Sequence, residues 1–540
     1  MVAGAAAKPN FCHGPREPVK NPASDPLSQP PTRVRYGVLG FGCSLAALTY
    51  LDRACVASAA PTLVRDLGLN SVADLKWAFA AFALAYGLFE VPAGWWGDRF
   101  GPRRVLMRIV LWWSAFTALT GCVGMRLGNR VFGSFSCGGG TLFGLSLPML
   151  VITPLVTLVV CSFLFGMGEA GAFPNITRAL HNWFPMRQRG FAQGAVWMSG
   201  RLMGGLTPIV WMVLVQGIGH GGADASHPAL AQPWLPPLVH WRTAFWLFGL
   251  LGLVWCLGFT LWFRNWPEEK RQVNAAELAW IRRDGPRPQA ATAGVPWARI
   301  LASRNLWAIC AMYGLQSFGW YFYITYLPHF LEEQFAVPST SFLGAVYKGG
   351  PLWLGAVGCL TGGLLTDWFI RKTGNRRWGR RIFGVLGHAL TATCFLLCPL
   401  APNAACFFVA ISLAGFCTDL AMGSAWAACQ DIGGRYAAIV ASFMNMTGNL
   451  GGAIAGWLTG LVLQNSLDAY AAQRGLHATG LLSAAAQLGP ADKALGLRHG
   501  YQTSFLIFAS VYVLGVVCWL CIDATKPIVP DEIDPETSLS

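Results

Sequence analysis

The sequence GWWGDRFGPRR, residues 94–104, separates two long apolar stretches and decides how the fold is interpreted. It contains a glycine, an aspartate one helical turn later, a second glycine and a basic run. The same order of residue types recurs in GLLTDWFIRKTGNRR, residues 363–377. Each copy follows the second apolar stretch of its half of the chain. A duplicated fold is the simplest explanation.

Composition identifies the environment of the chain. The 540 residues are 54% hydrophobic and 12% charged, whereas a soluble domain is ~25% charged. Apolar runs of about 20 residues recur along the whole length and indicate membrane-spanning helices. The net charge of +14 is compatible with a nucleic-acid partner, but the basic residues cluster in alternate loops, as the positive-inside rule requires. We therefore predict a protein that lies in a lipid bilayer and binds no nucleic acid.

We predict an all-α membrane protein with twelve transmembrane helices in two pseudo-symmetric six-helix bundles. The N-terminal bundle covers residues 36–263 and the C-terminal bundle residues 305–523, with a charged linker at 264–304. Residues 1–35 and 524–540 are the tails, and the first is expected to be a disordered cytoplasmic tail. The expected spans are residues 37–59, 77–97, 105–125, 147–173, 190–216, 241–263, 305–330, 343–366, 382–400, 404–428, 437–464 and 502–522.

The loops also predict orientation and exclude some chemistry. Basic residues gather after the second and eighth spans, between the fourth and fifth, and in the linker, all on the side of both termini. That side is expected to be cytoplasmic in an inner or plasma membrane. The 16 cysteines are scattered through apolar stretches, and the pair Cys518 and Cys521 lies in the last one, so we interpret them as small core residues. We expect no metal and no cofactor.

Four further segments narrow the interpretation. They are YLDR at 50–53, GEAGAFPN at 168–175, WYFYITYLP at 320–328 and MNMTGNLGG at 444–452. Together with the repeated loop, they resemble the major facilitator superfamily. Within it they resemble the anion:cation symporter branch, which includes galactonate, glucarate and hexuronate transporters, sialin and vesicular glutamate transporters. The resemblance covers about residues 36–525 and implies transport by alternating access between the two bundles.

The chain departs from that branch at two places. Members often carry an arginine two turns before the glutamate of the fourth span, and the corresponding position here is Ser162. The stretch from Gly128 to Thr141 is longer and richer in glycine than the short connection in the family. Both departures bear on which substrate is carried.

Charged residues inside the apolar stretches are the main functional candidates. A charge at the bilayer centre costs at least ~2.5–3.5 kcal/mol and usually lines a functional path. The resemblance implies that Asp52 and Glu169 form the proton-coupling pair, because carboxylates in a low-dielectric site can exchange protons near neutral pH. The alternative is a static ion pair, such as Asp52 with Arg201. Asp419 and Lys348 are further intramembrane charges that are able to pair across the tenth and eighth spans.

Two arginines are candidates for binding an anion. Arg53 offers a planar guanidinium suited to a carboxylate or phosphate, and the alternative is a salt bridge that only stabilises the bundle. Arg201 shares a helical face with Gln193 and Trp197. Because Ser162 replaces the usual arginine, Arg201 is a candidate second cation.

Aromatic and amide side chains complete the predicted substrate site. Tyr50 and Tyr86 each present a hydroxyl beside an aromatic face, which suits polyol recognition, and Glu90 shares a face with Tyr86. Helix packing is the alternative for the tyrosines, and interhelical hydrogen bonding is the alternative for the amides. The resemblance implies substrate contacts in the second half from Ser424, Trp426, Asn445 and Asn449.

The repeated loops are gating elements by resemblance, and a purely topogenic role is the alternative. Asp98 lies at the end of its span, where it can pair with a basic group or a helix N-terminus. Such contacts would close the cytoplasmic side and break on opening. The predicted gating residues are Asp98, Arg99, Arg103, Arg104, Asp367 and Arg371.

We therefore predict a monomeric secondary transporter that imports a small organic anion, such as a sugar acid, together with a proton. Sodium remains open as the coupling ion. The alternatives are an exporter or uniporter of an organic anion or phosphate, and a nutrient sensor that binds without transport. An enzyme is not expected, because the sequence shows no nucleophile–base pair and no cluster with metal-ligand spacing.

Overall fold

The computed structural model describes residues 29–69, 72–127, 130–137, 141–142, 145–146, 150–217, 236–285, 294–337, 342–476 and 487–529. Most of the two predicted tails, residues 1–28 and 530–540, lies outside the described residues, as does part of the stretch from Gly128 to Thr141.

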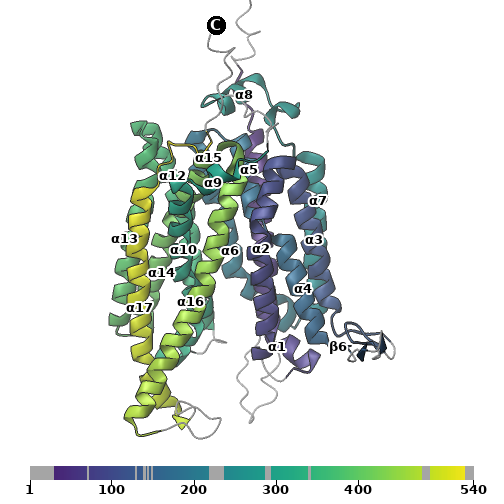
Figure 1. The fold of residues 1–540 in the computed structure, drawn as a ribbon, viewed down its shortest axis with the longest axis vertical. Helices are drawn as coiled ribbons and strands as arrows, with labels where there is room; N and C mark the ends of the chain where they lie inside the picture. Colours follow the sequence, from purple (N-terminus) through teal and green to yellow (C-terminus); the bar gives the residue numbers. More distant parts are fainter. Residues whose placement is uncertain are drawn as a thin grey trace, which may run out of the picture.

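The N-terminal half consists of long helices that run roughly parallel to the long axis of the molecule (Figure 1). Within it α1 packs against α6, α2 against α4, and α3 against α7. We use "N-terminal half" for these elements, which are α1 (Val34–Leu67), α2 (Lys76–Phe100), α3 (Pro102–Cys122), α4 (Pro154–Glu169), α5 (Ala172–Trp183), α6 (Arg189–Trp211) and α7 (Trp241–Trp262).

The C-terminal half repeats this packing. Here α10 packs against α16, α12 against α14, and α13 against α17. Between the halves, α6 packs against α12 and α2 against α16. We use "C-terminal half" for α10 (Arg304–Thr325), α11 (Leu327–Phe335), α12 (Phe342–Thr373), α13 (Arg376–Leu397), α14 (Ala404–Leu420), α15 (Met422–Gly433), α16 (Ala437–Gln473) and α17 (Pro490–Cys521).

Short elements lie at the two ends of the helices. The linker helices α8 (Ala275–Arg282) and α9 (Trp297–Leu301) mark the end that we call the linker end (Figure 1). Antiparallel two-stranded ladders pair β1 with β2, β3 with β6 and β4 with β5. The strands are Arg126–Leu127, Arg130–Val131, Phe135–Cys137, Thr141–Leu142, Leu145–Ser146 and Leu150–Ile152. Single turns of helix are Val72–Leu75, Met186–Gln188, Met212–Gln216, Pro267–Glu269, Cys398–Leu400 and Gly434–Tyr436.

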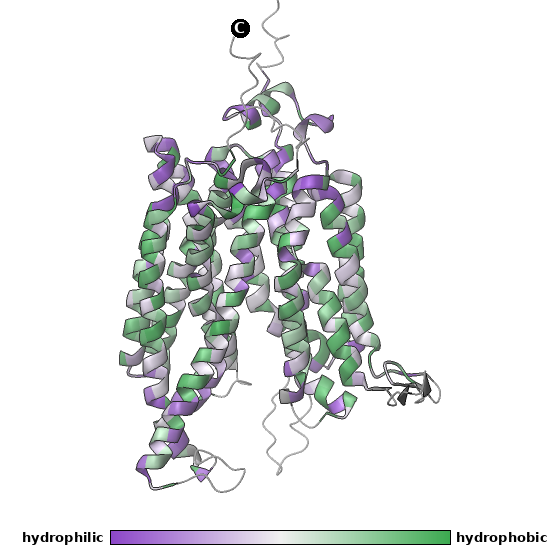
Figure 2. Ribbon diagram, viewed as in Figure 1, coloured by the Kyte–Doolittle hydropathy of each residue, from purple (hydrophilic) through white to green (hydrophobic). Residues whose placement is uncertain are grey.

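Along most of their length the helices consist mainly of hydrophobic residues, and hydrophilic residues gather at their ends (Figure 2). Leu257 and Leu261 of α7 and Trp457 of α16 are more than 60% exposed, which only a lipid environment makes favourable. In the described residues, ten helical stretches are long and apolar enough to cross a membrane. One of these stretches, residues 404–473, contains both α14 and α16. Helix α10 is not among the ten but, at 22 residues, is as long as α7. Twelve long helices of the described chain thus match the twelve predicted spans in position.

Several predicted boundaries are wrong by more than a turn. The fourth span begins at Pro154 rather than at residue 147, because Thr153 caps the helix and Pro154 fits its first turn. Helix α5 then continues to Trp183, where a loop was predicted. Helices α16 and α17 extend to Gln473 and back to Pro490, well beyond the predicted limits. These extensions carry charged residues, so hydropathy detects only the part of each helix that lies in the apolar layer.

Linker helix α8 is anchored to the first span by a buried carboxylate. Glu277 is fully buried, and its Oε1 accepts hydrogen bonds from the Arg35 backbone at 3.2 Å and from the Arg35 guanidinium at 3.0 Å. Its Oε2 accepts from the Val34 backbone at 3.2 Å. A side chain from the linker therefore caps the N-terminus of α1, where negative charge is favourable.

Replacing Glu277 with alanine is expected to lower the free energy of unfolding by about 3–5 kcal/mol, because Arg35 is left buried without its counter-charge. The matched control is Glu268→Ala, which breaks the partly exposed pair with Arg282 at 2.7 Å and should cost less than about 1 kcal/mol. Denaturant unfolding of the purified protein measures both values. Equal effects would show that Glu277 does not fasten the linker.

Candidate functional site

The fourth span is broken at its centre, beside a buried carboxylate. Helix α4 ends at Glu169, and α5 begins at Ala172 after Gly171 adopts a left-handed conformation with φ 82°. Arg53 of α1 donates from Nε to Oε1 of Glu169 at 2.6 Å. Glu169 is fully buried, whereas the Arg53 side chain is 27% exposed. Within the pair, Arg53 is therefore partly accessible and Glu169 is not. A discontinuous helix with a charge at its break is typical of binding sites in secondary transporters.

Asp52 lies close to this pair but does not join it. It is 3% exposed, and its Oδ1 has no hydrogen-bond partner among the residues that the structure describes. It lines a cavity of about 20 Å³ together with Ser162, Thr117 and Thr120. That volume holds about one water molecule. Ser162, the position where the resembling family often has an arginine, therefore lines the same small cavity as Asp52.

The second candidate cation, Arg201, bridges the two halves. Its Nε donates to Oδ2 of Asp419 at 2.7 Å and its Nη2 to Oδ1 at 3.1 Å, which is a bidentate pair between α6 and α14. Its Nη1 donates to the Tyr50 hydroxyl at 2.6 Å, and its guanidinium lies 4.2 Å from the ring centre of Trp320. The alternative in which Arg201 pairs statically with Asp52 is wrong. Asp419 forms its ion pair with Arg201 rather than with Lys348.

Glu169 and Asp419 occupy corresponding places in the two halves. Asp419 lies one residue before the end of α14, and Ala421 separates α14 from α15. Each carboxylate therefore sits at a break in the fourth helix of its half and accepts hydrogen bonds from an arginine on another helix. The duplicated fold thus has an acid–arginine pair at the end of the fourth long helix of each half.

An aromatic cluster lies beside Arg201, whose guanidinium is 5.3 Å from the ring centre of Trp197. Trp197 stacks on Phe173 with ring centres 4.4 Å apart and contacts Trp426 of the other half at 5.1 Å. Gln193, one turn from Trp197, is 1% exposed, and its Nε2 has no hydrogen-bond partner among the described residues. The sequence predicted Gln193, Trp197 and Trp426 as parts of one site. The structure brings Trp197 and Trp426 into contact, and Gln193 lies one turn before Trp197 on α6. Phe173 belongs to the cluster but was not predicted as a site residue. Its position four residues after Glu169 could have suggested it.

The predicted amides connect α16 to α2. Asn445 donates from Nδ2 to the Tyr86 hydroxyl at 3.1 Å and to Oε1 of Glu90 at 2.9 Å. Asn449 accepts from the Tyr321 hydroxyl at 3.3 Å. Glu90 is fully buried and, although the sequence analysis noted its shared face with Tyr86, it was not predicted as a site residue. Its charge inside an apolar stretch is the sequence feature that could have identified it.

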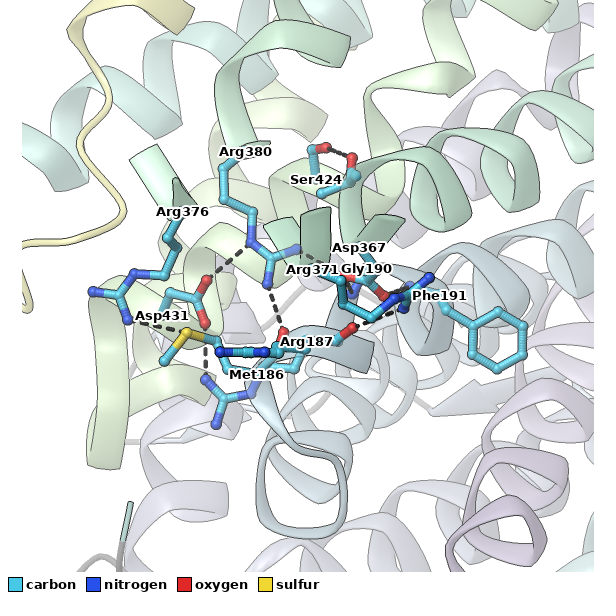
Figure 3. A network of polar contacts seen from close by, with 12 residues as sticks. Met186, Arg187, Gly190, Phe191, Asp367, Arg371, Arg376, Arg380, Ser424 and Asp431 are labelled. Carbon is cyan, nitrogen blue, oxygen red and sulfur yellow. Dashed lines mark hydrogen bonds and ion pairs between the residues drawn. The ribbon is translucent and has the colours of Figure 1, made fainter. Parts of the chain in front are cut away.

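Ser424 is not part of this central region. Its hydroxyl shares a hydrogen bond of 2.6 Å with Thr366, directly before Asp367 (Figure 3). The serine is completely buried and belongs to the packing of α12 against α15. The structure thus places Ser424 near the linker end rather than beside Asn445.

The aspartate of each repeated loop caps a helix of the opposite half. Asp98 accepts from the backbone of Ala438 at 3.2 Å and of Ile439 at 2.9 Å, in the first turn of α16. Its Oδ1 also lies 3.5 Å from Nε of Arg178. The prediction that Asp98 pairs with a basic group or a helix N-terminus is confirmed, and it does both.

Asp367 makes the equivalent contact in the other direction (Figure 3). It accepts from the backbone of Gly190 at 3.1 Å and of Phe191 at 2.7 Å, in the first turn of α6. Arg380 of α13 donates to Asp367 at 3.3 Å and to Asp431 at 2.9 Å. Arg380 is fully buried yet was not predicted, because it lies outside the repeated motif. These contacts join the halves at the linker end.

The basic residues of the loops differ in what they contact. Arg371 donates to the backbone carbonyl of Arg187 across the halves at 3.3 Å. Arg103 donates to the carbonyl of Thr260 at 2.6 Å, within its own half. Arg99 lies over the rings of Trp95 and Phe100, and Arg104 lines a groove on α3. Among the arginines predicted to gate, Arg371 is the one that these contacts place across the halves.

Replacing Asp367 with asparagine is expected to loosen the linker end. One acceptor oxygen becomes an NH2 group that faces a backbone N–H or Arg380, and hydrogen bonds to charged groups contribute about 1.5–3 kcal/mol. Amide hydrogen exchange should quicken at residues 186–192. Arg104→Gln, in the corresponding basic run but without a cross-half contact described here, is the control. If amide hydrogen exchange at residues 186–192 is unchanged in Asp367→Asn, the Asp367 contact does not help to close the linker end.

Comparison with known proteins is consistent with this geometry. Residues 42–456 match the family described as Major Facilitator Superfamily. The chain is 30% identical to the probable sulfoacetate transporter SauU of Cupriavidus necator over 437 residues, 80% of this chain and 88% of that protein. It is 28% identical to the probable galactarate/D-glucarate transporter GudP of Escherichia coli over 376 residues, 67% of this chain and 72% of that protein.

Solved structures show the same fold. The Escherichia coli fucose:proton symporter superposes with a TM-score of 0.55 at 14% identity, covering 89% of this chain and 99% of that one. A proton:xylose symporter superposes with a TM-score of 0.59 at 14% identity, covering 91% and 97%. The family match, the identity to SauU and the helical architecture agree. This chain is a multi-pass membrane transporter, not an enzyme, and it belongs to the major facilitator superfamily.

Proposed function

We propose that this protein is a proton-coupled secondary transporter of a small organic anion that carries a carboxylate, a sulfonate or both. The observation that carries the proposal is the pair of Arg53 and Glu169 at the break of the fourth span, with Arg53 accessible and Glu169 closed off. The relatives named as transporters of sulfoacetate and of galactarate or glucarate support the substrate class.

The proposed coupling is a competition for Arg53. When Glu169 is ionised, it occupies the guanidinium at 2.6 Å. When Glu169 takes up a proton, the attraction falls and Arg53 becomes available to the anion. The proton bound to Glu169 and the anion bound to Arg53 are then carried across the membrane in the same transport cycle. Asp52 supplies a second carboxylate nearby. It lines the small cavity, its Oδ1 has no hydrogen-bond partner among the described residues, and it is proposed to hold a proton during transport.

Arg201 is proposed to serve as a second anion-binding cation. Tyr50 accepts a hydrogen bond from it directly and lies three residues before Arg53 on α1. A substrate with acidic groups at both ends would reach one arginine with each. In this proposal Asp419 competes with the anion for Arg201, as Glu169 competes with it for Arg53. Ser162 leaves Asp52 without the arginine of the resembling family, so the second cation comes from α6 instead of α4.

Transport is proposed to proceed by rocking of the two halves about this central site. The contacts of Asp98 and Asp367 hold the linker end closed, and release of both helix caps would open it. We propose that the linker end faces the cytoplasm, that the protein works as a monomer in the plasma or inner membrane, and that the anion moves inward. Basic residues at the linker end support this orientation.

A thermal-shift screen of the purified protein tests the proposal. Sulfoacetate, galactarate and glucarate are compared with the neutral polyol galactitol. A ligand at about 100 times its dissociation constant adds ~2.7 kcal/mol to stability, so an acidic ligand should raise the melting temperature and galactitol should not. Preference for the neutral polyol would contradict an anion site. Binding without counterflow in liposomes would favour a sensor over a transporter.

A further inference from the structure

We propose that the lipid-facing side of α3 holds an anionic phospholipid, with its phosphate on Arg104 and Arg108 and one acyl chain along the apolar residues below. A groove of about 540 Å³ runs along this side. None of its lining residues makes a cross-half contact described above, and its Trp112 packs against Gly168, the residue before Glu169. Its lining residues are Arg104, Met107, Arg108, Leu111, Trp112, Ala115 and Phe116.

The spacing of these residues divides the groove into a charged end and an apolar length. Arg104, Arg108, Leu111 and Ala115 recur at helical intervals and form one stripe. The arginines belong to the first two turns of α3, at the linker end, and the apolar residues follow toward the middle of the span. Leu111 is 46% and Trp112 38% exposed on the protein surface. This order matches a phospholipid, whose phosphate lies at the interface and whose chain enters the apolar layer.

Arg108 carries the observation that calls for a ligand. Its Nε and Nη2 are buried and have no hydrogen-bond partner among the described residues. The contact found for its guanidinium is the ring of Trp96, 4.5 Å away. A cation–π contact satisfies charge but not N–H donors. Arg108 is partly buried. Because a charge in a spanning helix is costly without a counter-charge, an acceptor is expected beside its guanidinium, and a phosphate provides several oxygens.

Neighbouring side chains keep the groove open rather than filling it. The Trp112 indole donates from Nε1 to the carbonyl of Leu164 on α4 at 2.8 Å, which holds the ring to one side. Ala115 is exposed and presents only a methyl group at the end of the stripe farthest from Arg104. A chain can therefore lie over Ala115 between the Trp112 ring and Phe116. Charge complementarity at one end and a small residue at the other favour a lipid over a free anion.

The test measures thermal unfolding of the full-length protein in mixed micelles that contain phosphatidylglycerol, phosphatidylcholine, or phosphatidylcholine with inorganic phosphate. Phosphatidylglycerol should raise the melting temperature, and the other two additions should not. In Arg108→Gln and in Arg104→Gln the apparent affinity for phosphatidylglycerol should fall about fivefold, since each cation contributes ~1 kcal/mol near an anionic lipid. Ala115→Trp should weaken binding with no change of charge, because it fills the groove.

Lys372→Gln is the matched control, because Lys372 also lies at the linker end over a tryptophan, Trp368, at 5.2 Å. It should keep wild-type affinity for phosphatidylglycerol. The proposal is overturned if Lys372→Gln loses as much as Arg108→Gln, or if Ala115→Trp and Arg104→Gln both bind as the wild type does. An equal stabilisation by inorganic phosphate would also overturn it, since the ligand would then be a free anion. Arg104 is exposed, so its replacement leaves the fold intact.

Discussion

Replacing Glu169 with glutamine is expected to abolish accumulation of the anion against its gradient while leaving exchange of labelled for unlabelled anion. The amide keeps the shape of the carboxylate and can still accept from Arg53, which now donates at 2.6 Å. It cannot take up or release a proton at physiological pH. The step that links the anion to the proton is therefore lost, and the movement of the two halves is kept. Uptake and counterflow in proteoliposomes measure the two activities separately.

The matched control for this variant is Glu333→Gln. Glu333 accepts from the Tyr501 hydroxyl at 2.7 Å in the C-terminal half, away from the central site. It should keep both accumulation and exchange. If Glu169→Gln concentrates the anion as well as the wild type does, Glu169 is a structural partner of Arg53 and the coupling lies elsewhere.

Replacing Arg53 with alanine is expected to weaken binding of the anion by about 30-fold or more. Loss of one partner of a desolvated charge pair costs on the order of 2–5 kcal/mol, and ~1.4 kcal/mol corresponds to tenfold. Arg53→Lys should also bind weakly, because an ammonium lacks the planar fork. The rings of Tyr86 and Phe82, 4.4 and 5.4 Å from the guanidinium, hold it in one orientation that lysine does not reproduce.

Arg65→Ala is the control for this series, because Arg65 lies on the same helix with a side chain that is 79% exposed. It should bind the anion like the wild type. Equilibrium binding by calorimetry or by thermal shift measures all three variants. If a folded Arg53→Ala protein binds the anion with wild-type affinity, Arg53 does not hold the anion. Arg201, paired with Asp419, would then be the primary anion site.

The sequence predicted the helices and their order well, because twenty apolar residues in a row have few other solutions. It did not predict where polar helix extensions end, as at Gln473 of α16, because hydropathy carries no signal outside the apolar layer. It also did not predict the ladders before Pro154, which fall in a Gly-rich stretch with few features. The break after Glu169 follows from Gly171, whose left-handed conformation is identifiable only in the structure.

The central charges could be identified from their cost in a membrane, but their partners could not. Arg201 and Asp419 are 218 residues apart and meet across the two halves. The repeated loops located Asp98 and Asp367, yet each accepts from backbone amides of a distant helix, and every residue has such an amide. Pairing of this kind depends on how α2 meets α16 and how α12 meets α6, which no local pattern encodes.

The most direct test of coupled anion transport is uptake of labelled sulfoacetate and glucarate into proteoliposomes with and without an inward proton gradient. A proton gradient alone should raise uptake of at least one of them, a protonophore should remove the increase, and sodium should have no effect. Uptake that requires sodium, or that is indifferent to the proton gradient, would contradict the proposed exchange of Glu169 and anion on Arg53.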